Sequence, residues 1–145
     1  MTTNNPTPSG YSRVCPYLMV DSIEVQIDFL QKVFNADIKE NLKNSEGIVM
    51  HGEVKIGDII IMMGRGSEKF PSTQGMNYVY VNNVDEVYNK AIELGSTSVS
   101  TPTDQFYGLR DGGFKDPQGN TWFIAQFIKN VSVEDMEKGF VDTKS

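Results

Sequence analysis

The sequence predicts an α+β fold in which one β-α-β-β-β unit occurs twice. The first observation is the order of local patterns: a strand, a helix and three strands precede a segment containing Gly, Ser and Pro at residues 64–75, and the same order follows it. The second is that the halves align at a nearly constant offset, residues 20–23 with 81–84 and residues 52–55 with 112–115. Self-similarity at one offset indicates two structural repeats.

The helix of the first half is expected from Ile23 to near Asn35. Its apolar residues recur at i, i+4, i+7 and i+11, the spacing of one helix face, and Asp21-Ser22 precede it like the start of a capping box. A tight turn at Gly57-Asp58 indicates a hairpin. The strands of this half are expected at Val14–Val20, Ile38–Leu42, Ile48–Lys55 and Ile59–Met63.

The second half follows the same plan. Apolar residues from Val84 to Leu94 mark a helix that stops at Gly95, because glycine readily adopts the left-handed conformation that ends helices. Its strands are expected at Met76–Val81, Thr97–Ser100, Phe106–Lys115 and Thr121–Ile128.

This pattern predicts one domain with short extensions. The 145 residues suit a single domain, and 39% apolar with 22% charged residues is ordinary globular composition. We expect a disordered leader at 1–12 and the domain at 13–130. Repeat one is expected at 14–63, the linker at 64–75, repeat two at 76–128, and a tail at 131–145 that adds a short helix after Ser132.

The charge balance excludes several partners. Thirteen basic against nineteen acidic residues leave a net charge of −6, so the positive surface that nucleic acids or anionic membranes need is missing. No apolar run reaches the roughly 18 residues of a membrane span, and residues 1–10 do not resemble a signal peptide. One cysteine, Cys15, cannot form an internal disulfide, which favours a cytoplasmic location.

The sequence contains few of the side chains that usually bind transition metals. With only His51 and Cys15, a zinc site made of His and Cys alone would have at most two ligands, whereas structural zinc sites use four. The number of His and Cys residues does not exclude a carboxylate-rich site for magnesium, calcium or manganese. No G-x-S-x-G nucleophile motif is present.

Four stretches carry a family resemblance: residues 16–20 (PYLMV), 51–58 (HGEVKIGD), 107–110 (YGLR) and 116–122 (DPQGNTW). Together with the repeat, they make residues 14–128 resemble the vicinal oxygen chelate superfamily of glyoxalase I, bleomycin-resistance proteins and extradiol dioxygenases, and its PhnB-type branch in particular. The resemblance implies the glyoxalase/bleomycin-resistance fold: a funnel-like curved mixed β-sheet with the helices outside.

The resemblance also bears on metals and cofactors. Metal-dependent relatives place His or Glu ligands on the first, fourth, fifth and eighth strands. The matching positions here are Cys15, Met76 and Phe123, and the fourth strand (59–63) contains no ligand type. We therefore expect no metal and no cofactor. Where the branch pattern usually carries His after the Asp-Pro-x-Gly turn, this chain has Asn120, so Asp116 and Asn120 are expected to order the turn.

Candidate site residues follow from strand alternation and the resemblance. Histidine is the side chain that ordinarily titrates near neutral pH. His51 is expected to share a strand face with Glu53, so we expect either a base oriented by a carboxylate or a structural histidine. Arg110, beside glycines, either clamps an anionic ligand group or pairs with Asp104 or Asp111. We expect the ligand to contact Tyr17, His51, Glu53, Tyr78, Tyr80, Tyr107, Arg110 and Phe123. His51, Tyr107 and Arg110 are expected to face one cavity.

Three functions remain open. The preferred interpretation is a metal-free protein that binds a small molecule in the funnel or in the cleft of a homodimer. Sequestering that molecule is one form that this binding role could take. The acidic balance suits a cationic or neutral aromatic ligand. One alternative is a lyase or isomerase using His51 and Arg110 as its catalytic residues. The other is an interaction domain whose pocket is filled by its own side chains.

Overall fold

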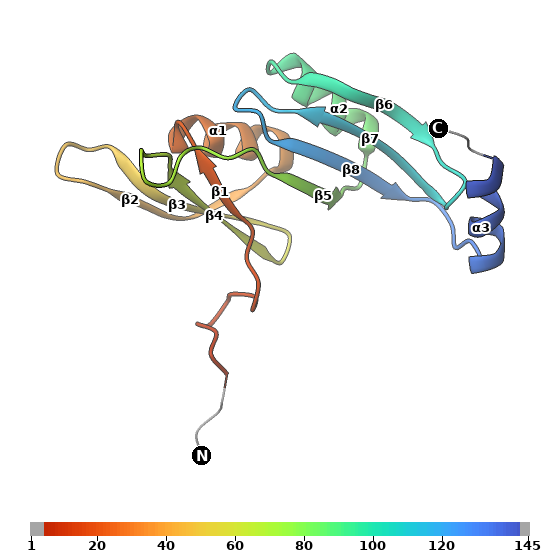
Figure 1. Ribbon diagram of the computed structural model, residues 1–145, viewed down its shortest axis with the longest axis horizontal. Coiled ribbons are helices and arrows are strands. Elements are labelled where there is room, and N and C mark those ends of the chain that lie inside the picture. The colour runs from red at the N-terminus through yellow and green to blue at the C-terminus, as the bar shows by residue number, and fades with distance from the viewer. Residues whose placement is uncertain (1–4, 143–145) are drawn as a thin grey trace. The chain divides into compact units, whose positions relative to one another are not determined.

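The computed structural model describes residues 5–142 and divides the chain into two compact units, residues 1–74 and 75–145 (Figure 1). The first four residues of the expected leader and the last three of the expected tail lie outside the described residues. Each unit contains one four-stranded sheet with a helix on one face, so the predicted α+β fold of two βαβββ repeats is confirmed.

The sheet of the first unit has the strand order β1-β4-β3-β2. Strand β1 is parallel to β4, and the other neighbours are antiparallel. A two-residue turn, with Gly57 at φ 59°, joins β3 to β4, as the sequence predicts. The elements are β1 (Tyr17–Val20), α1 (Ile23–Phe34), β2 (Asp37–Lys43), β3 (Val49–Ile56) and β4 (Ile59–Arg65).

Helix α1 begins where the capping pattern predicts. The hydroxyl of Ser22 accepts a hydrogen bond from the backbone N–H of Val25 at 3.2 Å, and Asn35, in the left-handed conformation, ends the helix. The helix packs directly over Gly52 of β3: a Cβ there would lie 2.7 Å from Ile23 Cγ2 and 3.0 Å from Ile27 Cδ1. Close packing of a mainly apolar helix face on the sheet thus makes the core of this unit.

The second unit repeats the topology with the strand order β5-β8-β7-β6. Asn83 caps α2 by accepting from the N–H of Glu86, and Gly95, at φ 99°, follows its end. The elements are β5 (Met76–Tyr80), α2 (Val84–Glu93), β6 (Thr97–Asp104), β7 (Leu109–Lys115), β8 (Thr121–Phe127) and α3 (Val133–Asp142). The helix expected in the tail is therefore present, and Phe140 packs edge-on against Phe106 at 5.1 Å between ring centroids.

The core of the second unit contains a buried polar turn. Phe114 and Trp122 are fully buried, and Asp116 is 4% exposed. The Asp116 carboxylate accepts from the backbone N–H groups of Gln118 and Asn120, and from the indole N–H of Trp122 at 2.9 Å. The expectation that Asp116 orders this turn is confirmed.

Several strand limits differ from the sequence-based expectation. Strand β4 continues to Arg65 because its last residues pair with β1. Strand β6 continues to Asp104. It is an exposed edge strand, and its Ser, Thr and Pro residues do not form the alternating apolar pattern from which strands are predicted. Strand β7 begins only at Leu109, because Gln105 and Gly108 close a turn with Gly108 at φ 90°. Cys15 precedes β1 and is not part of a strand.

Among residues 5–142, no helix combines the length and apolar character needed to cross a bilayer.

Candidate functional site

Each sheet has one face covered by its helix and one open face. In β1, Leu18 and Val20 are buried, whereas Tyr17, which alternates with them, is on the helix-free side and is half exposed. In β5, Tyr78 and Tyr80 are the exposed members of the same alternation. Apart from Arg110, which is described below, the polar candidates lie on these open faces.

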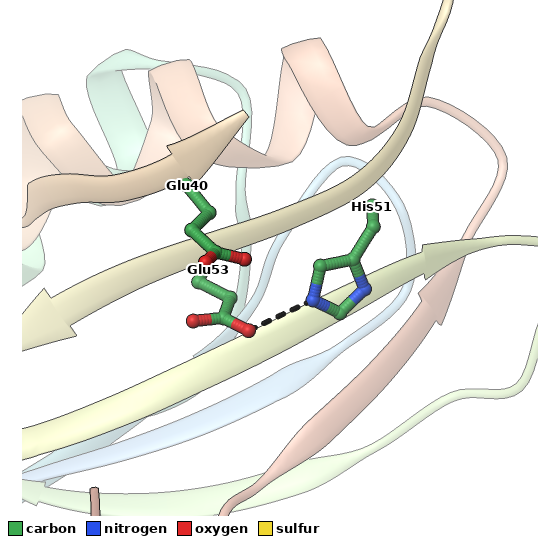
Figure 2. Close-up of side chains that lie close together, drawn as sticks. All are labelled: Glu40, His51 and Glu53. Atoms are coloured by element: carbon green, nitrogen blue, oxygen red, sulfur yellow. Dashed lines mark hydrogen bonds and ion pairs between the residues drawn. The ribbon is translucent and has the colours of Figure 1, made fainter. Parts of the chain in front are cut away.

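The open face of the first sheet carries a group of polar side chains that we call the His51 cluster: Tyr11, Tyr17, Glu40, His51 and Glu53. His51 and Glu53 are alternate residues of β3 and therefore share a face. The ring atom Nε2 of His51 lies 2.9 Å from Oε2 of Glu53 (Figure 2). Its other ring nitrogen, Nδ1, lies 3.4 Å from Oη of Tyr17. The predicted pairing of an imidazole with a carboxylate is present.

Gly64 makes the contact between Tyr17 and His51 possible. It lies on β4, between β1 and β3, and pairs directly with His51. A Cβ at this position would lie 2.9 Å from the Tyr17 hydroxyl, so a larger residue would occupy the space through which the phenol reaches across the strand.

Glu53 is 4% exposed and has two polar partners. Besides its contact with His51, it accepts a hydrogen bond from the hydroxyl of Tyr11 at 2.5 Å. This hydrogen bond to the carboxylate raises the pKa of Tyr11 to about 12, so the phenol stays a donor at neutral pH. Tyr11 belongs to the segment predicted to be a disordered leader, and this contact ties it to the sheet.

The open face of the second sheet carries the Asp111 cluster: Tyr78, Gln105, Tyr107 and Asp111. The Asp111 carboxylate accepts hydrogen bonds from all three neighbours: Gln105 Nε2 at 3.0 Å, Tyr78 Oη at 3.5 Å, and the Tyr107 hydroxyl. Burial, followed by the charge of Asp111, raises the pKa of Tyr78 to about 12. Burial and the hydrogen bond to Asp111 raise the pKa of Tyr107 well above its usual range.

Aromatic side chains extend this face. Tyr80 is 68% exposed and contacts Tyr78 edge-on, with 5.5 Å between ring centroids. The ring of Phe123 lies over Gly113, where an added Cβ would approach it to 2.8 Å. An open pocket of about 410 Å³ at the end of this sheet is lined by Tyr80, Val81, Asn82, Gln126 and Phe127.

Arg110 does not share this open face, which corrects the expectation that it faces one cavity with Tyr107 and His51. It alternates with Asp111 and points to the side of α2. Its guanidinium makes two hydrogen bonds to Asp85, at 2.8 and 3.0 Å, and one to Asp104 at 3.1 Å. Of the two roles expected for Arg110, the structure shows the ion pair with Asp104, to which Asp85 is added as a second partner. Its guanidinium lowers the pKa of the Asp85 carboxyl.

Three members of the clusters, Tyr11, Glu40 and Gln105, were not identified from the sequence. Glu40 reaches the cluster through a β-bulge, and Tyr11 through a segment without a repeating pattern. The sequence did contain a signal for Asp111, because the offset of 60 residues between the halves aligns it with His51.

Chemically, the two open faces offer hydrogen-bonding phenols, a histidine–carboxylate pair and exposed rings on a duplicated βαβββ scaffold.

The chain belongs to the Glyoxalase/Bleomycin resistance protein/Dioxygenase superfamily, whose family model matches residues 12–124. It is also similar to the uncharacterized protein Rv0887c of Mycobacterium tuberculosis, with 26% identity over 133 residues that cover 84% of this chain and 78% of the relative.

Solved structures have the same fold. TioX from Micromonospora sp. ML1 superposes with a TM-score of 0.69 at 23% identity, covering 81% of this chain and 99% of TioX. A PhnB protein from Bacillus cereus, described as a putative 3-demethylubiquinone-9 3-methyltransferase, gives a TM-score of 0.65 at 18% identity, covering 79% of this chain and 99% of that protein. The resemblance to the superfamily and to its PhnB-type members is confirmed.

Proposed function

We propose that the protein is a homodimeric binding protein for a small, flat, neutral or cationic aromatic molecule, held on the open face of the second sheet. The observation that carries the proposal is the exposure of large apolar side chains on that sheet: Met76 is 70%, Tyr80 68% and Phe127 61% exposed. Large exposed apolar patches are rare on ordinary protein surfaces, and where they occur they usually mark a binding site.

The polar groups beside these rings support the same ligand class. Tyr78 and Tyr107 keep their protons at neutral pH, and Asp111 supplies a negative charge between them. Aromatic faces attract cations, and the net charge of −6 favours a cationic over an anionic ligand. Arg110, which would favour an anion, is paired with Asp85 and Asp104 on the other face.

The alternative, a lyase or isomerase, was expected to use His51 and Arg110 as catalytic residues. Arg110 is on the helix-covered face and is paired with two carboxylates, so it does not support that role. The remaining support for this alternative is the contact between His51 and Glu53, which would suit a general base. We therefore place binding before catalysis.

The test is a titration with proflavine, a planar aromatic cation, and with an anionic naphthalene sulfonate for comparison. We expect proflavine to bind more tightly than the sulfonate. Tyr80→Ala should weaken proflavine binding roughly three- to thirtyfold, the range of about 0.6–2 kcal/mol for a cation on an aromatic ring. The matched control is Phe70→Ala, which removes a 62% exposed ring from a loop of the other unit.

Equal loss of affinity in both variants, or tighter binding of the sulfonate, would contradict the proposal. Light scattering tests the dimer: the expected mass is about twice the 16.2 kDa of one chain. A monomer at micromolar concentration would remove the dimer from the proposal.

A further inference from the structure

We propose that Glu40, His51 and Glu53 form a binding site for a divalent transition-metal ion on the open face of the first sheet. Each side chain offers one ligand atom, and these atoms all lie within 4.8 Å of one another (Figure 2). The three residues are on β2 and β3. The site is therefore distinct from the family positions at Cys15, Met76, Phe123 and β4, on which the expectation of no metal was based. It does not depend on the proposed ligand site of the second sheet.

A β-bulge brings the third ligand into place. Ile38 pairs with Val54, so regular pairing would set Lys39 opposite Glu53 and make a favourable pair of opposite charges. Instead the register shifts by one residue, and Glu40 is the direct partner of Glu53. Like charges directly opposite each other destabilise a sheet. A bound cation would turn this unfavourable pair of carboxylates into a pair of ligands.

The surroundings of His51 suit a metal ligand. Its Nε2 points to the carboxylates, whereas Nδ1 lies 3.4 Å from the Tyr17 hydroxyl oxygen. When a metal replaces the proton on Nε2, the remaining proton is on Nδ1, where the Tyr17 oxygen can accept it. Histidines that bind metals usually donate their second N–H in this way.

The carboxylate of Glu53 is also held in position. Tyr11 donates to Oε1, which leaves Oε2 directed toward His51 and the metal position. Glu53 is 4% exposed, so a metal there would be partly shielded from water and its attraction to the ligands strengthened.

One imidazole and two carboxylates define the class of ion. This donor set suits Zn²⁺, Co²⁺ or Mn²⁺ better than Ca²⁺, which takes six to eight oxygen ligands, and it contains no thiolate to select a soft ion. Three protein ligands leave further coordination positions for water or for a bound molecule.

The test uses the full chain without a histidine tag, freed of metal by a chelator and titrated with ZnCl₂ by calorimetry. We expect one Zn²⁺ per chain. Glu40→Gln and His51→Gln should each weaken binding by roughly a hundredfold, and Tyr17→Phe by roughly tenfold, as for partners of metal-bound histidines. Glu46→Gln, which removes an exposed carboxylate from the neighbouring β2–β3 loop, is the matched control.

A second measurement identifies the ligand directly. His51 is the only histidine of the chain, so the ¹⁵N signals of one imidazole report its state without ambiguity. Zn²⁺ should shift the Nε2 signal strongly and leave Nδ1 protonated. No binding of Zn²⁺ or Co²⁺ at tenfold excess, unchanged imidazole signals, or equal affinities in Glu40→Gln and Glu46→Gln would each overturn the proposal. Because Glu40 and His51 are only partly buried, circular dichroism is expected to show both variants folded.

Discussion

The two sheets have the same topology and carry different chemistry on their open faces. In the first, His51 and the buried Glu53 form a compact ionisable group with few exposed rings around it. In the second, the residue aligned with His51 is Asp111, which accepts from two phenols and an amide beside exposed aromatic rings. The β-α-β-β-β scaffold thus specifies where side chains point, and single positions on it decide what each face can bind.

The two units also differ in their cores and in the turns that join their central strands. In the first, a two-residue turn joins β3 to β4, and mainly apolar side chains of α1 pack on the sheet. The second joins β7 to β8 by a longer turn, which Asp116 holds from inside the core through Trp122. One half therefore depends on close apolar packing, and the other on a buried polar turn.

Asp116→Ala should cause the largest loss of stability, about 3 kcal/mol, because it leaves the buried indole N–H of Trp122 and two backbone N–H groups without their acceptor. Asp58→Ala, in the exposed turn of the first sheet, should change the free energy of unfolding by less than about 0.5 kcal/mol. Urea unfolding of both variants measures the difference. Equal effects would show that the two turns contribute alike.

Gly52→Ala should destabilise the first unit by about 1–3 kcal/mol, because the added methyl group would meet Ile23 and Ile27 in the tightly packed face of α1. Gly64→Ala, on the open face of the same sheet, should cost less, because the atoms that the added methyl group would meet belong to the outer parts of the Tyr17 and Met19 side chains, which can move aside more easily. Thermal unfolding compares the two. A greater loss in Gly64→Ala would mean that the open face is packed more tightly than α1.

The tyrosines of the two open faces should titrate differently once their carboxylates are removed. The raised pKa of Tyr11 is due first to its hydrogen bond with Glu53, so Glu53→Gln should return it toward about 10. The raised pKa of Tyr78 is due first to burial, so Asp111→Asn should lower it by a smaller amount. Ultraviolet absorbance, which detects ionised tyrosine, measures both shifts.

The sign of the pH effect on stability follows from the same values. Native pKa values near 12 exceed the ordinary value of about 10, so these tyrosines contribute fully below pH 10 and lose their contribution as the pH rises toward 12. The free energy of unfolding should therefore fall as the pH rises from about 10 to about 12, and it should fall less in Glu53→Gln. An unchanged decline in that variant would exclude Tyr11 as a cause.

Arg110→Ala should have the smallest effect: a slight decrease of the melting temperature, with proflavine and Zn²⁺ binding unchanged. Its partners Asp85 and Asp104 are 51% and 69% exposed, and ion pairs in such positions contribute little. Calorimetry of the variant gives both quantities. Loss of proflavine binding would restore Arg110 to the ligand site.

The sequence alone determined the repeat, the two main helices and most of the strands, because these depend on local periodicity, capping residues and turn glycines. Ser22, Asn83 and Gly57 act over a few residues, so their signals can be read in order along the chain. The alternation of buried and exposed residues along β1 and β5 has a local origin too, since successive side chains of a strand point to opposite faces.

The partners of the site residues, in contrast, depend on how distant segments of the chain pack together. Glu40 meets Glu53 because a bulge shifts β2 by one residue, and a shift of one residue moves a side chain to the other face. Arg110 pairs with Asp85 because α2 begins above its strand, 25 residues away in sequence. Tyr17 reaches His51 across the space left by Gly64. Register and contacts between distant segments arise only when the chain packs, so local patterns could name His51, Glu53 and Arg110 but could not say which groups they touch.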